Sequence, residues 1–366
     1  MTKEIYLVDL HANYLSIKSE IDAAIKNIIE NSSYIMGQAV SDFEKEYARI
    51  TDSKFCVTTS NGSSSLFLAL KAIGFENGDE AITVPNTFIA TSEAISLAGG
   101  KIKFVDVDKK TLLMDPESLE KGITQKTKVI IPVHLYGQMA DMKRIKEIAD
   151  KHGLYIIEDA AQAHLSEFNG RQPGYYSDVA SYSFFPAKNL GCYGDGGCIT
   201  TNNQEYSEKI SKLRDHGRSS KYEHDMEGFN FRMDALQAAI LSVKLKYLEN
   251  WTVQRIKNAK IYNSFLKGTV ASPYDENNRR ITYYMYVIMS KERENIMKNL
   301  KANKISSAIH YPIPLHLQQA YENLNYRKGQ FPNAENGCSK IVSLPMFPEL
   351  NNEDIERICK CVIEVL

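Results

Sequence analysis

The sequence predicts an α/β fold with a mostly parallel sheet flanked by helices, followed by a smaller C-terminal α+β domain. From about residue 41, short apolar runs typical of strands alternate with segments whose apolar residues recur at helical spacing. The 366 residues also exceed one ordinary core, at roughly 150 residues per domain. Short buried strands separated by helices favour a parallel sheet, which binds ligands beyond the carboxyl ends of its strands.

The large domain is expected to cover residues 1–250. Helices are predicted at 63–73, 91–97 and 141–151, the last ended by Gly153. Runs rich in β-branched and apolar residues predict the strands, at 55–59, 81–84, 102–105, 128–133, 154–158, 179–184 and 198–201.

The smaller domain is expected to cover residues 251–366. One or two long helices over 233–267 should lead into it, because apolar residues recur there every three or four positions. Beyond them the pattern predicts an aromatic-rich strand over 281–289, a helix, and a second strand ending near His310. A terminal helix, capped near residues 351–352, completes this domain.

The composition excludes several classes of partner. With 44 basic and 45 acidic residues the net charge is -1, so no broad basic surface is available, and we expect neither nucleic acid nor a membrane as partner. The run MTKEIYLVDL has no charged segment followed by an apolar core, and no apolar run reaches roughly 20 residues, so we expect a cytoplasmic chain without a secretory leader. The six cysteines and eight histidines show no zinc-type spacing, and we expect no metal.

Lys188 is the most informative candidate for chemistry. It lies in the run SYSFFPAKNLG, close to Phe184, Phe185, Pro186 and Leu190. An ammonium group among apolar side chains has little water to solvate it, which favours the neutral and nucleophilic amine that Schiff-base chemistry requires. The alternative is a surface lysine whose stem covers apolar neighbours while its charge stays in water. The surrounding segments must decide between the two.

Three further segments lie where strands of the predicted sheet end. Residues 61–65, NGSSS, open a helix and could hold a phosphate, although an ordinary helix cap is an equal alternative. Asp159 follows the strand 154–158 and could keep a pyridine nitrogen protonated, unless it only caps a helix. Phe88 could stack on an aromatic cofactor, although a single aromatic residue belongs more often to a core. Together with Lys188, these residues meet the requirements of pyridoxal phosphate.

Five sequence segments together are specific enough to indicate one protein family. In chain order they are TSNGSSSL, NTFIAT, EDAAQAH, SFFPAKNLGCYGDGG and GFNFRMDALQAA. With them the chain resembles the DegT/DnrJ/EryC1/StrS family of sugar aminotransferases, from about residue 5 to its end. The resemblance implies the type I aminotransferase fold and pyridoxal 5'-phosphate as cofactor.

The resemblance also implies a role for each site residue. Lys188 would form the Schiff base with the cofactor and act as the catalytic base, and Asp159 would pair with the pyridine nitrogen. Gln162 would contact the phenolic oxygen of the cofactor, and Phe88 would stack on its ring. The cofactor phosphate would be bound by Gly62, Ser63 and Ser183 and, from the second subunit of a homodimer with shared active sites, by Asn230. One departure is the run 165–167, Leu-Ser-Glu, where the family usually has small residues.

Two polar segments are candidates for binding a nucleotide-linked keto sugar, whose diphosphate needs local cations and hydroxyl groups. The run 215–224 precedes Asn230 and offers Arg218, Tyr222 and His224, unless it is a solvated loop. In residues 308–318 two prolines fix the path of the chain and could direct side chains into the site. These side chains are His310, Tyr311 and His316.

The run HYPIPLHLQ and the methionine of FRMDALQAA resemble family members that aminate carbon 3 of a dTDP-linked 3-keto-6-deoxyhexose. The expected donor is L-glutamate, and the product would be an amino sugar for glycan or secondary-metabolite biosynthesis. One alternative is amination at carbon 4 of a UDP- or dTDP-linked 4-keto sugar. A sugar dehydratase is a second alternative, although related dehydratases have histidine in place of the lysine. A non-catalytic regulator that binds pyridoxal phosphate is a third.

Overall fold

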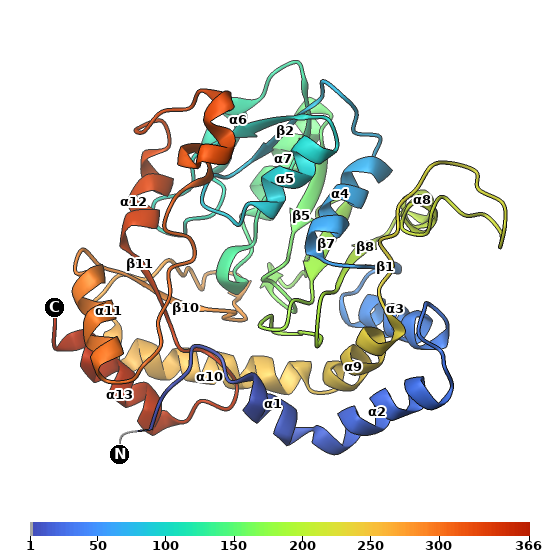
Figure 1. Ribbon diagram of the computed structural model, residues 1–366. Helices are drawn as coiled ribbons and strands as arrows, with labels where there is room; N and C mark the ends of the chain where they lie inside the picture. The colour runs from blue at the N-terminus through green and yellow to red at the C-terminus, as the bar shows by residue number, and fades with distance from the viewer. Residues whose placement is uncertain (1–2) are drawn as a thin grey trace.

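The core of the molecule is a seven-stranded sheet (Figure 1). The computed structural model describes residues 3–366. The strand order is β1-β8-β7-β5-β4-β2-β3, and within the described residues only β8 runs antiparallel to its neighbours. The mostly parallel α/β sheet predicted from the sequence is therefore confirmed. Its strands are β1 (Phe55–Thr59), β2 (Glu80–Thr83), β3 (Lys101–Phe104), β4 (Thr127–Ile130), β5 (Tyr155–Asp159), β7 (Val179–Ser183) and β8 (Gly197–Thr201).

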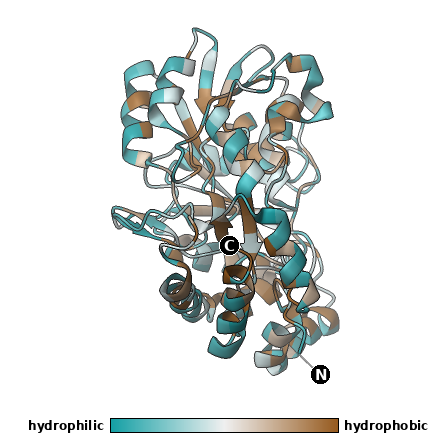
Figure 2. Cartoon of the chain, turned by 90° about the vertical axis from the view of Figure 1, so that its left-hand side faces the viewer, coloured by the Kyte–Doolittle hydropathy of each residue, from teal (hydrophilic) through white to brown (hydrophobic). Residues whose placement is uncertain are grey.

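Helices flank this sheet, as the alternating pattern predicts (Figure 1). They are α3 (Gln38–Ile50), α4 (Gly62–Ala72), α5 (Ala90–Leu97), α6 (Pro116–Gly122), α7 (Met142–His152) and α8 (Gln204–Leu213). Local signals set their ends. The Asp141 side chain accepts a hydrogen bond from the first turn of α7, and Gly153 ends that helix with a φ of 65°. Figure 2 shows the apolar strands enclosed by helices whose outer faces are hydrophilic.

Two helices, α9 (Ala235–Leu245) and α10 (Leu248–Leu266), run from the large domain to the small one. The predicted domain boundary at 250/251 falls in the first turn of α10. In the small domain, β10 (Tyr286–Met289) pairs antiparallel with β11 (Ile341–Leu344). The helices around this pair are α11 (Arg293–Ala302), α12 (Pro332–Lys340) and α13 (Asn352–Ile363), and Asn351 caps the last of them as expected.

The strand predicted before His310 is wrong. Ile305 and Ala308 each form only an isolated bridge, to Ile5 and Ser343, and β11 supplies the partner strand of β10 instead. Pro312 and Pro314 follow closely, and because proline has no N–H group to donate, a strand cannot continue through them.

The N-terminal segment packs back onto the small domain. Ile5 forms a parallel bridge with Ile305 and belongs to the apolar core of that domain. The chain then continues through α1 (Leu10–Ser16) and α2 (Lys18–Glu30) beneath the sheet (Figure 1). Two short strands, β6 (Glu167–Phe168) and β9 (Arg279–Arg280), form a further small sheet.

Three general features concern partners and metals. None of the helices in the described part of the chain is both long and apolar enough to cross a membrane. All six cysteines are buried free thiols. Among residues 3–366, no three histidine, cysteine or acidic side chains are grouped so that they could hold a metal ion.

Candidate active site

Lys188 lies on a tight loop that follows β7. The Cys192 N–H group donates to the Phe184 carbonyl at 2.8 Å and closes this loop. A Cβ added to Gly191 would lie only 2.2 Å from the Pro186 carbonyl oxygen. Because the carbonyl belongs to the backbone and cannot move aside, only glycine fits there. The sequence therefore fixes the path of the loop that carries the lysine.

The surroundings of the Lys188 amine differ from those expected. Phe184 and Leu190 point into the core, and Phe185 is 52% exposed, so these residues do not enclose the amine. Instead Nζ lies 4.3 Å from the centre of the Tyr284 ring, which comes from the far end of the chain. The aromatic face excludes water and attracts the ammonium form of the amine. Tyr284 was not predicted, because no sequence spacing links it to Lys188.

Asp159 ends β5 and is 6% exposed. Its carboxylate accepts hydrogen bonds from the Thr91 hydroxyl at 2.7 Å and from the Ala161 N–H at 3.2 Å. Burial raises the pKa of Asp159, whereas these two bonds and the charge of Lys188 lower it. A buried carboxylate is costly unless it meets a cation, and a protonated pyridine nitrogen is a suitable one. The position of Asp159 therefore fits the cofactor.

Gln162 lies on the turn after β5 and is buried. Its amide oxygen accepts the Tyr136 N–H at 2.7 Å, and its amide nitrogen donates to the Tyr311 hydroxyl at 3.4 Å. The Tyr311 ring lies 5.7 Å from that of Phe88, measured between centres, and Phe88 is 54% exposed. These contacts orient the NH₂ group of Gln162 and leave one face of Phe88 open.

The predicted phosphate residues come together at the N-terminus of α4. Asn61 caps this helix by accepting the Ser64 N–H at 2.8 Å. A Cβ on Gly62 would lie 2.8 Å from the Cβ atom of Ser183, so only glycine permits this close approach. Ser63 is exposed beside it. Backbone N–H groups and hydroxyls at a helix N-terminus form a cradle that suits a phosphate.

His164 is a buried residue of the site that sequence reasoning did not assign, although it stands in the EDAAQAH segment. Its Nε2–H donates to the Ser183 carbonyl at 2.9 Å, so Nδ1 accepts from the Tyr47 hydroxyl at 2.7 Å. Burial lowers the pKa of His164 to about 4. The neutral ring thus holds the backbone of Ser183 in place through its hydrogen bond to the Ser183 carbonyl.

The neutral state of His164 predicts acid sensitivity of the apoprotein. In the unfolded chain His164 binds a proton near pH 6.5, whereas in the folded chain it does so only near pH 4. The free energy of unfolding therefore falls as the pH drops from 6.5 to 4. The slope is at most about 1.4 kcal/mol per pH unit. Urea unfolding at a series of pH values should show a shallower slope for His164→Gln. An unchanged slope would contradict the assignment.

His310 and Tyr311 lie with the central residues, whereas His316 does not. His310 Nδ1 is 2.9 Å from the Ser343 hydroxyl, and burial followed by the charge of Lys188 lowers the pKa of His310 to about 4. His316 is 2% exposed and its Nε2 lies 3.1 Å from the Glu335 carboxylate, in a separate cluster. The structure therefore does not bring His316 together with Lys188, and its substrate-binding role stays a prediction. The prolines fix the backbone path but not the direction of each side chain.

The segment after α8 projects from the body of the molecule (Figure 1). It carries Arg218, which forms a bridge with His224, and Tyr222, which is 81% exposed. Asn230 pairs with Asp215 and is also exposed. Within the described chain the structure brings none of these four predicted residues into contact with Lys188.

The unusual run 165–167 joins the two domains. The Ser166 hydroxyl lies 2.8 Å from both the Gly137 carbonyl and the Thr282 hydroxyl, and Glu167 pairs with Arg280 across β6 and β9. These contacts hold the segment that places Tyr284 against Lys188.

Comparison with known proteins gives a consistent result. The sequence profile described as the DegT/DnrJ/EryC1/StrS aminotransferase family matches residues 15–363. A "Pleiotropic regulatory protein" from Geobacillus stearothermophilus is 43% identical, with 98% of this chain and 97% of that protein covered. Two relatives are 40% identical, each over 97% of this chain and 98% of its own length. They are "UDP-2-acetamido-2-deoxy-3-oxo-D-glucuronate aminotransferase" from Pseudomonas aeruginosa and "dTDP-3-amino-3,6-dideoxy-alpha-D-galactopyranose transaminase" from Aneurinibacillus thermoaerophilus.

A crystal structure supports the fold directly. S. venezuelae DesV "in complex with ketimine intermediate" superposes with a TM-score of 0.97 at 36% identity, covering 99% of this chain and 98% of that one.

Proposed function

Because the chain belongs to the DegT/DnrJ/EryC1/StrS aminotransferase family, we propose that it transfers an amino group from L-glutamate to carbon 3 of a dTDP-linked 3-keto-6-deoxyhexose. It is a sugar aminotransferase dependent on pyridoxal phosphate. The donor, the nucleotide and the carbon atom are the parts that we propose. The observation that carries the proposal is the grouping of Lys188, Asp159 and Gln162 beside His310 and Tyr311.

The residues of the chain divide the chemistry among them. Bound pyridoxal phosphate supplies an aldehyde carbon for the amino group and a conjugated ring that takes up the electrons of the broken C–H bond. Lys188 would hold the cofactor between turnovers, and its Nζ would then serve as the base that carries a proton to and from the α-carbon of glutamate. Asp159 would hold the proton on the pyridine nitrogen, and Tyr284 excludes water from Nζ.

We also propose a homodimer in which each site is shared. The half of the site made by one chain is open, with Ser63 and Phe88 exposed. The projecting segment of Arg218, Tyr222 and Asn230 makes no contact with its own Lys188 and could reach the site of a second copy. In a symmetric pair the projecting segment of each copy would add its polar donors to the anion cradle of the other, so that both sites are completed in the same way.

Carbon 3 is favoured by the two relatives at 40% identity, whose names both specify a nitrogen or oxo group at that carbon. These names differ in the nucleotide, so the nucleotide needs its own test. The protein should be incubated with pyridoxal phosphate, heavy-nitrogen glutamate and dTDP-3-keto-6-deoxyglucose, and the products analysed by mass spectrometry. A labelled amino sugar is expected. Parallel reactions with a UDP-linked 3-keto sugar and a dTDP-linked 4-keto sugar should be slower, and a faster one would replace this substrate in the proposal.

The name of the relative at 43% identity makes a regulatory role the second candidate. A regulator that only binds the cofactor needs no group to move a proton, and yet Lys188, Asp159 and Gln162 are all present. Glutamate alone, added to the cofactor-loaded protein, should change its visible absorption. No change would favour the regulator over the enzyme.

A further inference from the structure

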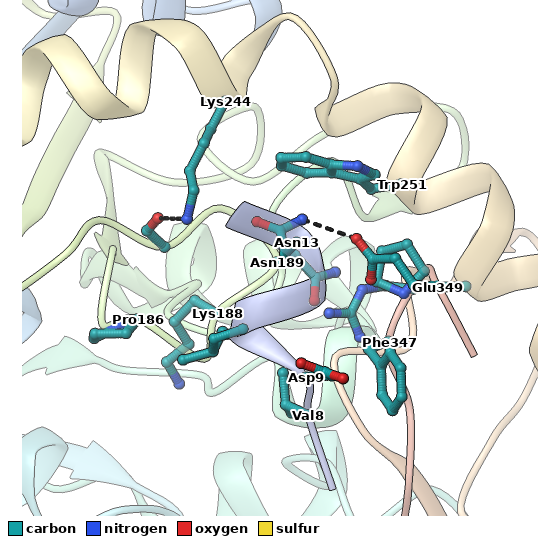
Figure 3. A pocket seen from close by; sticks show the side chains of 14 residues that line it. Val8, Asp9, Asn13, Pro186, Lys188, Asn189, Lys244, Trp251, Phe347 and Glu349 are labelled. Atoms are coloured by element: carbon teal, nitrogen blue, oxygen red, sulfur yellow. Dashed lines mark hydrogen bonds between the residues drawn. The ribbon is translucent and has the colours of Figure 1, made fainter. Parts of the chain in front are cut away.

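A small cavity lies behind the Lys188 loop, on the side that faces α9, α10 and the N-terminal segment (Figure 3). The space open to water is about 20 Å³, and a single water needs roughly 10–15 Å³. On one wall the buried Lys244 ammonium donates to the Gly191 carbonyl at 2.6 Å. On the opposite wall Asn13 donates to the Glu349 carboxylate at 3.1 Å. Asn189 lies between Lys188 and Glu349 in this view.

Three buried polar atoms that line this cavity have no hydrogen-bond partner among the described side chains and backbone. They are Asn189 Oδ1, Arg255 Nε and Glu349 Oε2. The orientation of the Asn189 amide is fixed, because its Nδ2 group donates to the Thr282 carbonyl at 3.0 Å, and the atom left without a partner is therefore the oxygen Oδ1. The arginine Nε can only donate, and the two oxygens accept.

A single water molecule has the donors and acceptors that these three atoms lack. It accepts one hydrogen bond from Arg255 Nε–H and donates two, to the oxygens of Asn189 and Glu349. Buried polar atoms of this kind are almost always paired, with protein or with ordered water. The size of the cavity and the balance of donors and acceptors therefore agree.

The same side chains hold the loop that carries Lys188 and the segment that carries Tyr284. Asn189 is the next residue along the loop. Arg255 donates through Nη1 to the Tyr283 carbonyl at 3.3 Å and to the Met346 carbonyl at 2.8 Å. The first of these bonds fixes the backbone beside Tyr284, whose ring covers Nζ. The loop and the ring are thus tied to one buried polar network.

We infer that Asn189 is a positioning residue for Lys188, held by Thr282 on one side and, on the other, by an enclosed water that it shares with Arg255 and Glu349. Asn189 acts on the Lys188 amine only by fixing the loop that carries both residues. The inference rests on the proposed function insofar as Lys188 is the reacting amine.

The variant Asn189→Leu removes both hydrogen bonds and keeps the branched shape of the side chain, although leucine is the larger residue. A shift of the reacting amine by about 1 Å lowers rates about 10²-fold, so kcat should fall by about 10- to 100-fold while KM for the sugar nucleotide stays unchanged. Capture of pyridoxal phosphate by the apoprotein, followed by visible absorption, should slow as well. This second readout does not depend on turnover.

Asn258→Leu is the matched control. Asn258 is equally buried and its Nδ2 donates to the Phe347 carbonyl at 3.0 Å, but it does not line the cavity. The Asn258→Leu variant should lose about as much free energy of unfolding as Asn189→Leu, but its kcat and its rate of cofactor capture should stay at the wild-type values. Equal behaviour of the two variants would overturn the inference. If the leucine variant does not fold, Asn189→Ala removes the same bonds without adding bulk, and the same comparison applies.

A crystal structure of the unliganded protein tests the water itself. One water within hydrogen-bond distance of all three atoms is expected. A dry cavity, or a side chain turned into it, would overturn the inference. If the wild type shows no reaction with glutamate, the proposed function fails, whereas the water and the capture rate still test the role of Asn189.

Discussion

Replacing Lys188 with alanine will abolish amino transfer and remove the visible absorption of the cofactor-loaded protein. Loss of the proton-transfer role alone lowers rates about 10²- to 10⁴-fold. Loss of the amine that binds the cofactor covalently adds to this. Among residues 3–366 no other lysine amine lies over the Tyr284 ring, so no other lysine is placed to take over this role. Steady-state kinetics with glutamate and an absorption spectrum measure both effects.

The control is Lys209→Ala. Lys209 donates to the Ala72 carbonyl at 3.1 Å, at the C-terminal end of α4 and so at the opposite end of that helix from Gly62. This variant should keep its spectrum and its activity. If Lys188→Ala retained either the absorption or the turnover, the assignment of the amine would be wrong.

Replacing Asp159 with asparagine should lower kcat by about 10²- to 10⁴-fold, because removing one partner of a buried charge pair costs about 3–5 kcal/mol. Asparagine keeps the shape and can still accept from Thr91, but it carries no charge to hold the proton on the pyridine nitrogen. The stability of the apoprotein should change much less than kcat. Burial raises the pKa of Asp159, so the protein disfavours the charged carboxylate relative to water, and the neutral amide offsets part of the hydrogen bonding that is lost.

Asp178→Asn is the matched control for this variant. Asp178 also carries a partly buried carboxylate with a pKa raised by burial, and it accepts the Ile156 N–H at 2.8 Å away from Lys188. It should keep kcat within a few-fold. A comparable loss of kcat in both variants would show that Asp159 acts through stability and not through the cofactor.

The strands of the large domain could be predicted because the sheet is buried on both faces, so each strand appears as a short apolar run. The prediction matches β1 and β7 to within a residue. The small domain was less predictable. β11 follows directly after α12 and its four buried residues carry no turn signal before them, whereas the run 305–309 before His310 is only partly apolar and is soon followed by prolines.

Site residues could be predicted from the sequence where they lie at the carboxyl end of a strand. Asp159 and Ser183 both end strands, and the close contact of Gly62 with Ser183 brings the phosphate cradle together as expected. Tyr284 and Arg255 could not be predicted. Packing of the small domain on the large one brings these two residues to the site, and such a contact produces no pattern in the sequence.

The most direct test of the central claim is to reduce the cofactor-loaded protein with borohydride, digest it, and locate the cofactor by mass spectrometry. The cofactor should be found on the peptide that contains Lys188. Adding glutamate before the reduction should prevent this labelling, because the donor amine displaces Lys188. Labelling of a different lysine, or labelling of Lys188 that glutamate does not prevent, would contradict the account.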